Sequence, residues 1–353
     1  MTMAIGRRDV MLGAVGFGVT LAAGPHLLSA ADSVAPRSFK TYRPVPGAGT
    51  DQTATLQAAL DAAAGSGMPL FLPPDVYSTS RLELKSGTHL LGVAGRSILR
   101  YRDGGALLSV DRAQDIRIEG LVLDGGGRAL GQDGALLGAL EVERIEISNC
   151  RFVGSSADGV ALERVSARIA NCHFADIRRT ALVSEESRTV EIAHNHIHAC
   201  GNHGILVRGS EPGEVTIASN IVDKAATGIA VRRFNQGGGL AVVRGNCVRD
   251  LSFRKCVQSS GTGISIEARA WVSGNVVDNA PGFGILVGRG EATVTDNRIR
   301  NVYIGIGIPA DRSGGTARVT GNAITGAKDG AIRALSGSAP ADHDLAAYTN
   351  LVS

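Results

Sequence analysis

The sequence predicts an all-β fold, a single-stranded right-handed parallel β-helix (a solenoid) with an N-terminal helix as its cap. A short pattern of apolar residues around Asn returns eight times between Arg144 and Leu335, and a period of roughly 20 to 50 residues is typical of solenoids. Within each copy, apolar residues alternate with polar or small ones, as in half-buried strands. Gly contributes 47 of the 353 residues, which suits a coil with several turns.

The first repeated feature is an Asn in each copy. In register, the column contains Asn149, Asn171, Asn195, Asn220, Asn246, Asn275, Asn297 and Asn322. An Asn at a sharp turn can bond its own backbone and the amide of the next coil, so we interpret the column as a structural ladder.

A second strand follows each Asn after a loop of variable length. These strands read DGVAL, TALVS, HGILV, TGIAV, TGISI, FGILV, IGIGI and DGAIR. Each period therefore holds two strands, which stack on their copies about 4.8 Å away, and the Val, Ile and Leu columns are expected to fill the interior.

The start of the chain resembles a twin-arginine export signal. Arg7 and Arg8 precede an apolar, Gly-rich run at 10–23, and the sequence around Ala31 is typical of a cleavage point. This run of about 14 residues is shorter than the roughly 18 that a membrane-spanning helix needs. We expect a signal peptide at 1–31, recognised by the twin-arginine translocation machinery, and a periplasmic or secreted protein with no stable membrane span.

The remaining chain divides into four expected segments. Residues 32–49 are interpreted as a leader, 50–110 as the cap helix with the first coils, 111–335 as the β-helix repeats and 336–353 as a polar tail. The cap helix is expected to have its capping residue at Thr50 or Asp51, to bury Leu56 and Leu60, and to stop at Gly65.

Charge and cysteine content exclude other classes of function. The formal net charge is +3, and it falls to +2 without 1–31, because that segment holds two Arg and one Asp. Such a balance indicates neither nucleic acid nor membrane as a partner. Three of the five Cys (Cys150, Cys172 and Cys247) follow a ladder Asn and are interpreted as small wall residues. No metal-binding spacing occurs, no disulfide pairing can be read, and the cofactor is unknown.

The order of the early segments resembles a known superfamily. A helix followed by LFLPPDVY at 70–77 and LELKSGTHLLGVAG at 82–95 is similar to the opening of the pectate-lyase-like β-helix superfamily, which includes phage tailspikes and alginate epimerases. The resemblance covers about 49–335. The export signal adds a similarity to a narrower family of twin-arginine-translocated β-helix repeat proteins. This likeness implies a fold and no particular activity.

Substrates of that superfamily lie along the outer face of one stacked sheet, which points to the residues just before the second strands. In this sequence these are Asp158, Arg179 with Thr180, His203, Thr227, Thr262, Phe283, Ile304 and Asp329. Polygalacturonases, which resemble the chain in fold, carry an Asp, an Asp pair and a His at three such positions. SADGV and NHGIL match the first and third, but RRTAL has no acidic pair. Inverting hydrolysis needs two carboxylates, so this departure argues against that type of hydrolase.

A lyase or epimerase needs a group that neutralises a uronate carboxylate and a base for the adjacent proton. We interpret three residues as catalytic candidates, with His203 as the base and Arg179 as a clamp: Asp158, Arg179 and His203. The substrate-binding candidates are Arg208, Arg232 and Glu163. The DPHD signature of mannuronan epimerases and the clustered Asp of pectate lyases are missing. An enzyme acting on an acidic polysaccharide and a non-catalytic solenoid that binds glycan or envelope components therefore both remain open.

The richest polar cluster is HNHIHACGNH, at 194–203. If Asn195 and Ile197 point inward, then His194, His196 and His198 share the outer face. Three His can bind zinc, but their spacing of about 7 Å is wide and the next coil offers no matching carboxylate. We interpret them as surface histidines and predict no metal site.

Overall fold

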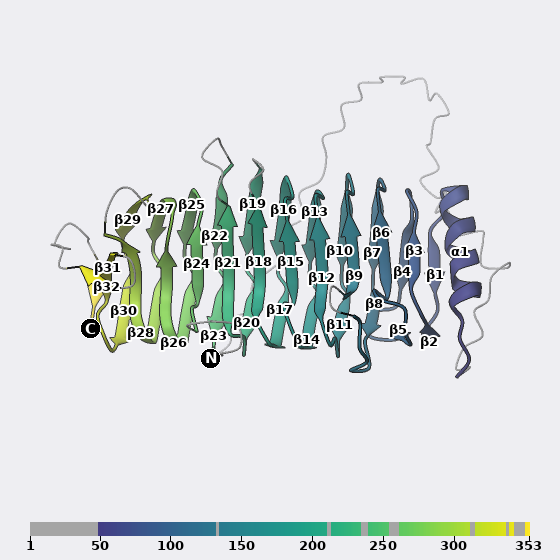
Figure 1. Cartoon of the computed structure of the whole chain (residues 1–353), viewed down its shortest axis with the longest axis horizontal. Helices are drawn as coiled ribbons and strands as arrows, with labels where there is room; N and C mark the ends of the chain where they lie inside the picture. The colour runs from purple at the N-terminus through teal and green to yellow at the C-terminus, as the bar shows by residue number, and fades with distance from the viewer. Residues whose placement is uncertain are drawn as a thin grey trace, which may run out of the picture. The chain divides into compact units, whose positions relative to one another are not determined.

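The structure, a computed structural model, describes residues 49–131, 134–209, 213–233, 239–253, 261–310, 315–336, 339–341 and 350–353. The expected signal peptide, with Arg7 and Arg8, and the leader up to residue 48 lie outside the described residues. The described chain forms the predicted right-handed parallel β-helix, with α1 (Thr53–Ser66) beside its first coil (Figure 1). None of the helices that the structure describes is long and apolar enough to cross a membrane.

Three stacks of parallel strands form the walls. Sheet A contains β1 (Leu70–Leu72), β4 (His89–Gly92), β7 (Ile116–Glu119), β10 (Ile145–Ser148), β13 (Ala167–Ala170), β16 (Thr189–Ala193), β19 (Glu214–Ala218), β22 (Ala241–Arg244), β25 (Ala270–Ser273), β27 (Gly290–Thr295) and β29 (Gly315–Thr320). Stack B follows each of these after a sharp turn, with β2 (Asp75–Thr79), β5 (Ser97–Tyr101), β8 (Leu121–Asp124), β11 (Arg151–Val153), β14 (His173–Ile177), β17 (His196–Cys200), β20 (Ile221–Asp223), β23 (Cys247–Arg249), β30 (Ala323–Ala327) and β33 (Leu351–Val352).

Stack C completes each coil. It contains β3 (Leu82–Leu84), β6 (Leu108–Asp111), β9 (Ala135–Leu140), β12 (Asp158–Glu163), β15 (Leu182–Glu185), β18 (His203–Gly209), β21 (Thr227–Arg233), β24 (Ile264–Glu267) and β31 (Ile332–Ser336), with β32 (Ala339–Ala341) antiparallel to β31. Two long strands, β26 (Val276–Val287) and β28 (Arg298–Pro309), run through stacks B and C. Each period therefore holds three strands, where the sequence predicted two.

Aliphatic side chains fill the interior, as the alternation predicted. Val215 and Ile217 on β19, and Ile205 and Val207 on β18, are fully buried. Strand register places Ile217 between Ile192 and Val243, so like residues stack from coil to coil. Burial of these columns is the main favourable term for a fold whose coils contact only their neighbours.

The ladder column is shifted by one residue in two of the predicted coils. Asn149 and Asn171 are exposed, with φ of 54° and 55°, and occupy the turn that precedes the ladder. Cys150 and Cys172 hold the ladder position instead, and Gly120 likewise lies in the turn column, with φ of 69°. The turn requires a left-handed backbone, which Asn and Gly adopt more easily than other residues, so an Asn fits either column.

From Asn195 onward the ladder follows one pattern. The backbone N–H and Nδ2 of Asn195 both donate to Oδ1 of Asn220, at 2.9 and 3.0 Å. Nδ2 of Asn220 also donates to the carbonyl oxygen of Ile192, one coil earlier, at 2.9 Å. The pattern continues to Asn350, whose Oδ1 accepts from the backbone of Asn322 at 2.9 Å. The side-chain amides from Asn195 to Asn322 are buried, and each has hydrogen-bond partners, as buried polar groups require.

Cysteines continue the ladder toward the N-terminus. The Sγ atoms of Cys150 and Cys172 lie 3.7 Å from the carbonyl oxygens of Ile118 and Ile147, which correspond to the carbonyls that the Asn side chains bond. Cys247, by contrast, is half-buried on β23 and lies outside the ladder. The prediction that all three are wall residues next to a ladder Asn is therefore wrong for Cys150 and Cys172, because the ladder column lies one residue later in those coils.

The helix α1 covers the first coil as predicted, with Leu56 and Leu60 buried. Its Gln57 side chain accepts from the Glu83 backbone N–H at 2.8 Å, which ties the helix to β3. The predicted stop at Gly65 is wrong by two residues. Gly67 ends the helix instead, with φ of 65°, a conformation that favours glycine.

A glycine column sets the start of the stack C strands. A Cβ on Gly204 would lie 2.4 Å from Val222 Cγ1 and 2.7 Å from the Gly228 carbonyl oxygen, and Gly228 meets Val248 in the same way. The backbone therefore passes directly over core side chains of stack B. This close approach explains the repeated Gly-Ile pattern and places the residue before each Gly at the same point of every coil.

Candidate functional site

The candidate catalytic residues lie at the start of the stack C strands. Asp158 begins β12 and His203 begins β18, and register places Thr180 between them. The register position in the middle coil thus belongs to Thr180, and Arg179 lies one residue earlier. Asp329 is likewise one residue before the column, which Gly330 occupies. In the other coils from β12 onward, a glycine follows the row position. In these two coils Ala replaces that glycine, so the sequence lacked the residue by which the row position is aligned.

Arg179 nevertheless reaches Asp158. Its Nη2 lies 3.3 Å from Asp158 Oδ2, and the Thr180 backbone N–H donates to Asp158 Oδ1 at 2.8 Å. Burial raises the pKa of the Asp158 carboxyl above its usual range, although the Thr180 hydrogen bond and the Arg179 charge act against this. Asp158 is thus a buried, oriented carboxyl group next to a cation.

His203 lies two strand spacings from Asp158, roughly 10 Å along the stack. Burial, and secondarily the charges of Arg232 and Arg208, lower the pKa of His203 to about 4. Its Nδ1 atom is buried with no hydrogen-bond partner among the described residues. The imidazole is therefore neutral at neutral pH, and two perturbed groups lie in one row, as is typical of functional sites.

The predicted substrate-binding residues form a second row at the far end of the same strands. Register aligns Glu163, Glu185, Arg208, Arg232 and Glu267 in one outward column. Each lies five residues after the first row, roughly 15 Å along an extended strand. Glu185 and Glu267 were missed by sequence reasoning. The constant offset of four residues from the column glycine, Gly263, was a signal that could have identified Glu267, whereas Ala181 replaces the glycine in the coil of Glu185.

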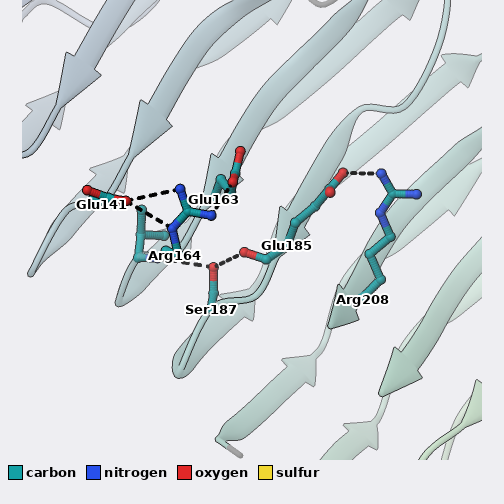
Figure 2. A network of polar contacts seen from close by, with 7 residues as sticks. Glu141, Glu163, Arg164, Glu185, Ser187 and Arg208 are labelled. Carbon is teal, nitrogen blue, oxygen red and sulfur yellow. Dashed lines mark hydrogen bonds and ion pairs between the residues drawn. The ribbon is translucent and has the colours of Figure 1, made fainter. Parts of the chain in front are cut away.

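Ion pairs link the members of this second row. Arg208 pairs with Glu185 (Figure 2), and Arg232 Nε lies 3.7 Å from Glu267 Oε1. Glu163 is held by Arg164, which also contacts Glu141 at 3.0 Å. Along the row, two Glu are followed by two Arg and then by one Glu. Each Arg pairs with the Glu next to it in the row, Arg208 with Glu185 and Arg232 with Glu267.

An apolar strip separates the two polar rows. Val183, Leu206 and Ala230 point away from the interior yet are buried, and they pack with Ala161. The face thus consists of a polar row, an apolar strip and a charged row. A depression of about 420 Å³ lies beyond the ends of β9, β12 and β15, and Arg164, the partner of Glu163, contributes to its lining. Two further depressions, lined around Lys224 and Trp271, lie elsewhere.

Three further histidines, His173, His196 and His198, lie on stack B, whereas His89 lies on β4 of sheet A. His194 does not share the face of β17, because it has φ of 58° and occupies the left-handed turn before the strand. His196 packs edge to face on His173, with ring centroids 5.0 Å apart. His198 Nδ1 lies 3.0 Å from Asp223 Oδ2. Within the described ranges, no group of three or more His, Cys, Asp or Glu is arranged to hold a metal ion.

Comparison with known proteins adds a family. The sequence matches the family described as right handed beta helix region over residues 103–248 and 133–299, which together span more than half of the chain. No curated protein matches the sequence.

Solved structures share the fold at low sequence identity. The pre-mature gene product 12 of bacteriophage phi29 is similar, with a TM-score of 0.60, 15% identity and coverage of 84% of this chain and 50% of that chain, so this chain spans half of the phage protein. The catalytic unit of the GH87 alpha-1,3-glucanase of Streptomyces thermodiastaticus strain HF3-3 is similar with a TM-score of 0.52 and 15% identity, and the match covers 89% of this chain and 67% of that chain. The A-module of a mannuronan C-5 epimerase of Azotobacter vinelandii is similar with a TM-score of 0.51 and 17% identity, and the match covers 86% of this chain and 94% of that chain. The fold and the family match agree, and the chain belongs to the right-handed β-helix region family.

Proposed function

We propose that the protein acts on an acidic polysaccharide along the outer face of stack C, as a lyase or an epimerase. The observation that carries the proposal is His203, a neutral imidazole under the influence of Arg208 and Arg232, in the same row as a buried carboxyl group. The likeness to a mannuronan C-5 epimerase module and a glucanase supports a glycan as substrate through the fold alone.

The arrangement suits removal of a proton next to a uronate carboxylate. A cation such as Arg179, Arg208 or Arg232 binds the carboxylate and stabilises the negative charge that develops on it. His203 takes the proton from the adjacent carbon. In elimination, the electron pair of that C–H bond forms a C=C bond, the bond to the glycosidic oxygen breaks, and this oxygen takes up a proton. In epimerisation, a proton returns to the same carbon from the opposite face.

An anionic substrate also changes His203 itself. Its low pKa makes it a weak base in the free protein, because burial and two nearby cations disfavour the charged imidazolium. A uronate carboxylate that pairs with Arg208 or Arg232 offsets part of this positive charge, and the pKa of His203 then rises toward its usual range. The base is thus strengthened when the acidic substrate binds, and a neutral glycan lacks this effect.

The test is to incubate the purified protein with polygalacturonate, polymannuronate and polyguluronate. We expect either ultraviolet absorbance of unsaturated uronates or uptake of deuterium from heavy water, seen by NMR. His203→Gln should abolish the signal and Asp158→Asn should reduce it, whereas His194→Gln, a change at an exposed turn, should leave it intact. Neither signal on any of the three polymers would refute the catalytic proposal.

A second function, non-catalytic binding of glycan or envelope components, is favoured by one observation. The charges of the second row pair with each other, as in Arg208–Glu185, so they are partly neutralised without substrate. Binding without turnover of these polymers, retained in His203→Gln and lost in Arg208→Gln, would support this alternative.

We also propose export to the periplasm or beyond through the twin-arginine route. The support is the pair Arg7 and Arg8 ahead of the apolar run at 10–23. Substitution of both by Lys should leave the protein in the cytoplasm, whereas Arg37→Lys and Arg43→Lys together, further along the chain, should not. Normal periplasmic recovery of the first variant in a fractionation experiment would contradict the export proposal.

A further inference from the structure

The outer face of sheet A changes character along its length. One outward column contains, in register, Arg117, Glu146, Arg168, Glu191, Thr216, Val242, Trp271, Thr293 and Arg318. Its first part alternates in charge. Its later part, from β19 onward, has small or apolar residues and an indole in place of the alternating charges, and a charge returns only at Arg318 on β29.

The first part neutralises itself. Arg117 Nε lies 3.7 Å from Glu146 Oε2, and Arg168 Nε lies 3.7 Å from Glu191 Oε2. These are exposed ion pairs, which satisfy both partners at little net gain in stability. No large apolar surface is presented there, so this part of the face has the properties of an ordinary solvated wall.

The later part presents the single Trp of the chain to solvent. Trp271 is 58% exposed and has Val242 and Thr293 as its neighbours in adjacent strands. It lines a depression of about 420 Å³ together with Arg269, Glu291 and Arg318. None of these three charged residues forms an ion pair with another described residue, so the lining carries one excess positive charge, two Arg against one Glu.

We propose that this surface, defined by Trp271, Thr293, Arg269 and Arg318, is a binding subsite for an acidic oligosaccharide. The flat indole offers a large apolar face for the C–H face of one pyranose ring. The Arg269 and Arg318 guanidinium groups, which form no ion pair within the described part of the chain, match a uronate carboxylate in bidentate geometry. The excess positive charge selects acidic over neutral sugars.

This subsite lies on a different sheet from the row of Asp158 and His203. The inference therefore goes beyond the proposed activity and does not require it. A long polymer bound here increases its effective concentration at any other site of the same chain, an effect that needs no new contact.

The experiment uses the one indole as its reporter. The full-length protein is titrated with oligogalacturonate and oligomannuronate, with a neutral glucan oligosaccharide of equal length as the comparison. We expect a saturable blue shift of the tryptophan emission with an acidic oligosaccharide, weakened by salt because exposed charges are screened. The neutral sugar should give a response about tenfold weaker or none. No shift with either acidic oligosaccharide would overturn the proposal.

Variants separate the subsite from the stack C row and from self-association. By calorimetry, Trp271→Ala should weaken binding about tenfold or more, Trp271→Phe less, and Arg318→Gln several-fold for acidic sugars only. Tyr303→Ala removes another exposed aromatic side chain, on β28, and should change nothing. His203→Gln should retain the emission response. Equal loss in Tyr303→Ala, or an emission shift that depends on protein concentration alone, would assign the indole to another role.

Discussion

Inward and outward columns of the same solenoid differ in how strictly they repeat. The inward column from Asn195 to Asn350 keeps one residue type through seven coils. The outward column from Glu163 to Glu267 changes sign twice within five. Each inward residue must complete the bonds of the coils on both sides, whereas an outward residue is solvated. Repetition therefore reports the fold, and departures on the outside report what distinguishes this chain.

A second contrast lies within the ladder itself. Cys150 and Cys172 occupy the position that Asn holds from residue 195 onward, and they approach equivalent carbonyl oxygens at a longer distance. A thiol is a weak hydrogen-bond donor. It also lacks the side-chain oxygen through which each Asn accepts a hydrogen bond from a neighbouring coil. The ladder position therefore holds a small side chain in all of these coils, but strong side-chain hydrogen bonds form only from Asn195 onward.

The largest expected effect comes from adding side-chain volume to the glycine column at the start of the stack C strands. Gly204→Val should destabilise the protein by about 3 kcal/mol or more, because its Cβ would lie 2.4 Å from Val222 Cγ1 and 2.7 Å from a backbone oxygen. Gly138→Val, at an outward position of β9 where the nearest atom is 3.9 Å away, is the matched control. Equal melting temperatures of the two variants would refute the role of the glycine column.

The next effect tests the ladder register. Asn220→Ala should cost about 3 kcal/mol, since it leaves the Asn195 backbone N–H and the Ile192 carbonyl oxygen unsatisfied in a buried site. Asn149→Ala, in the exposed turn column, should cost less than about 1 kcal/mol. Chemical denaturation measures both. An equal loss of stability in the two variants would mean that Asn149 belongs to the ladder column, as the sequence predicted.

A smaller effect concerns pH and the row of the candidate site. Folding lowers the pKa of His203 to about 4, so its neutral form is favoured in the folded state. This stabilisation is complete above the ordinary value near 6.5 and is lost as the pH falls from there toward 4. Between pH 7 and pH 5 the loss should be about 2 kcal/mol. His203→Gln should flatten this part of the curve of unfolding free energy against pH, and His194→Gln should not; an unaltered slope in the first variant argues against a buried neutral imidazole.

The smallest effect is expected from the outward charged row. Arg208→Gln should change the free energy of unfolding by less than about 1 kcal/mol, because its pair with Glu185 is exposed. A double-mutant cycle with Glu185→Gln measures the coupling. A coupling well above that value would mean that the charged row is part of the fold, and the contrast between inward and outward columns would fail.

By itself, the sequence determined the architecture. Alternation at Val215 and Ile217 indicated strands, the recurring Asn and Gly-Ile patterns indicated stacked coils, and Leu56 with Leu60 indicated the cap helix. These features follow from local rules that every coil must satisfy. The positions of Asp158 and His203 in one row also followed, because a residue before a constrained glycine has a fixed place in its coil.

Only the tertiary structure decided the register of Asn149, Asn171, Arg179 and His194, and the partner of each outward charge. A left-handed turn accepts Asn and His more readily than most residues, and the ladder position also takes Asn, so a column can be misread by one position without any change in composition. Ion pairs such as Arg179–Asp158 depend on long side chains that reach across coils, and their direction is set by packing and by neighbouring charges. The exposed indole of Trp271 is decided in the same way, because its surroundings come from strands about 20 to 30 residues apart in sequence, a spacing set by the solenoid period.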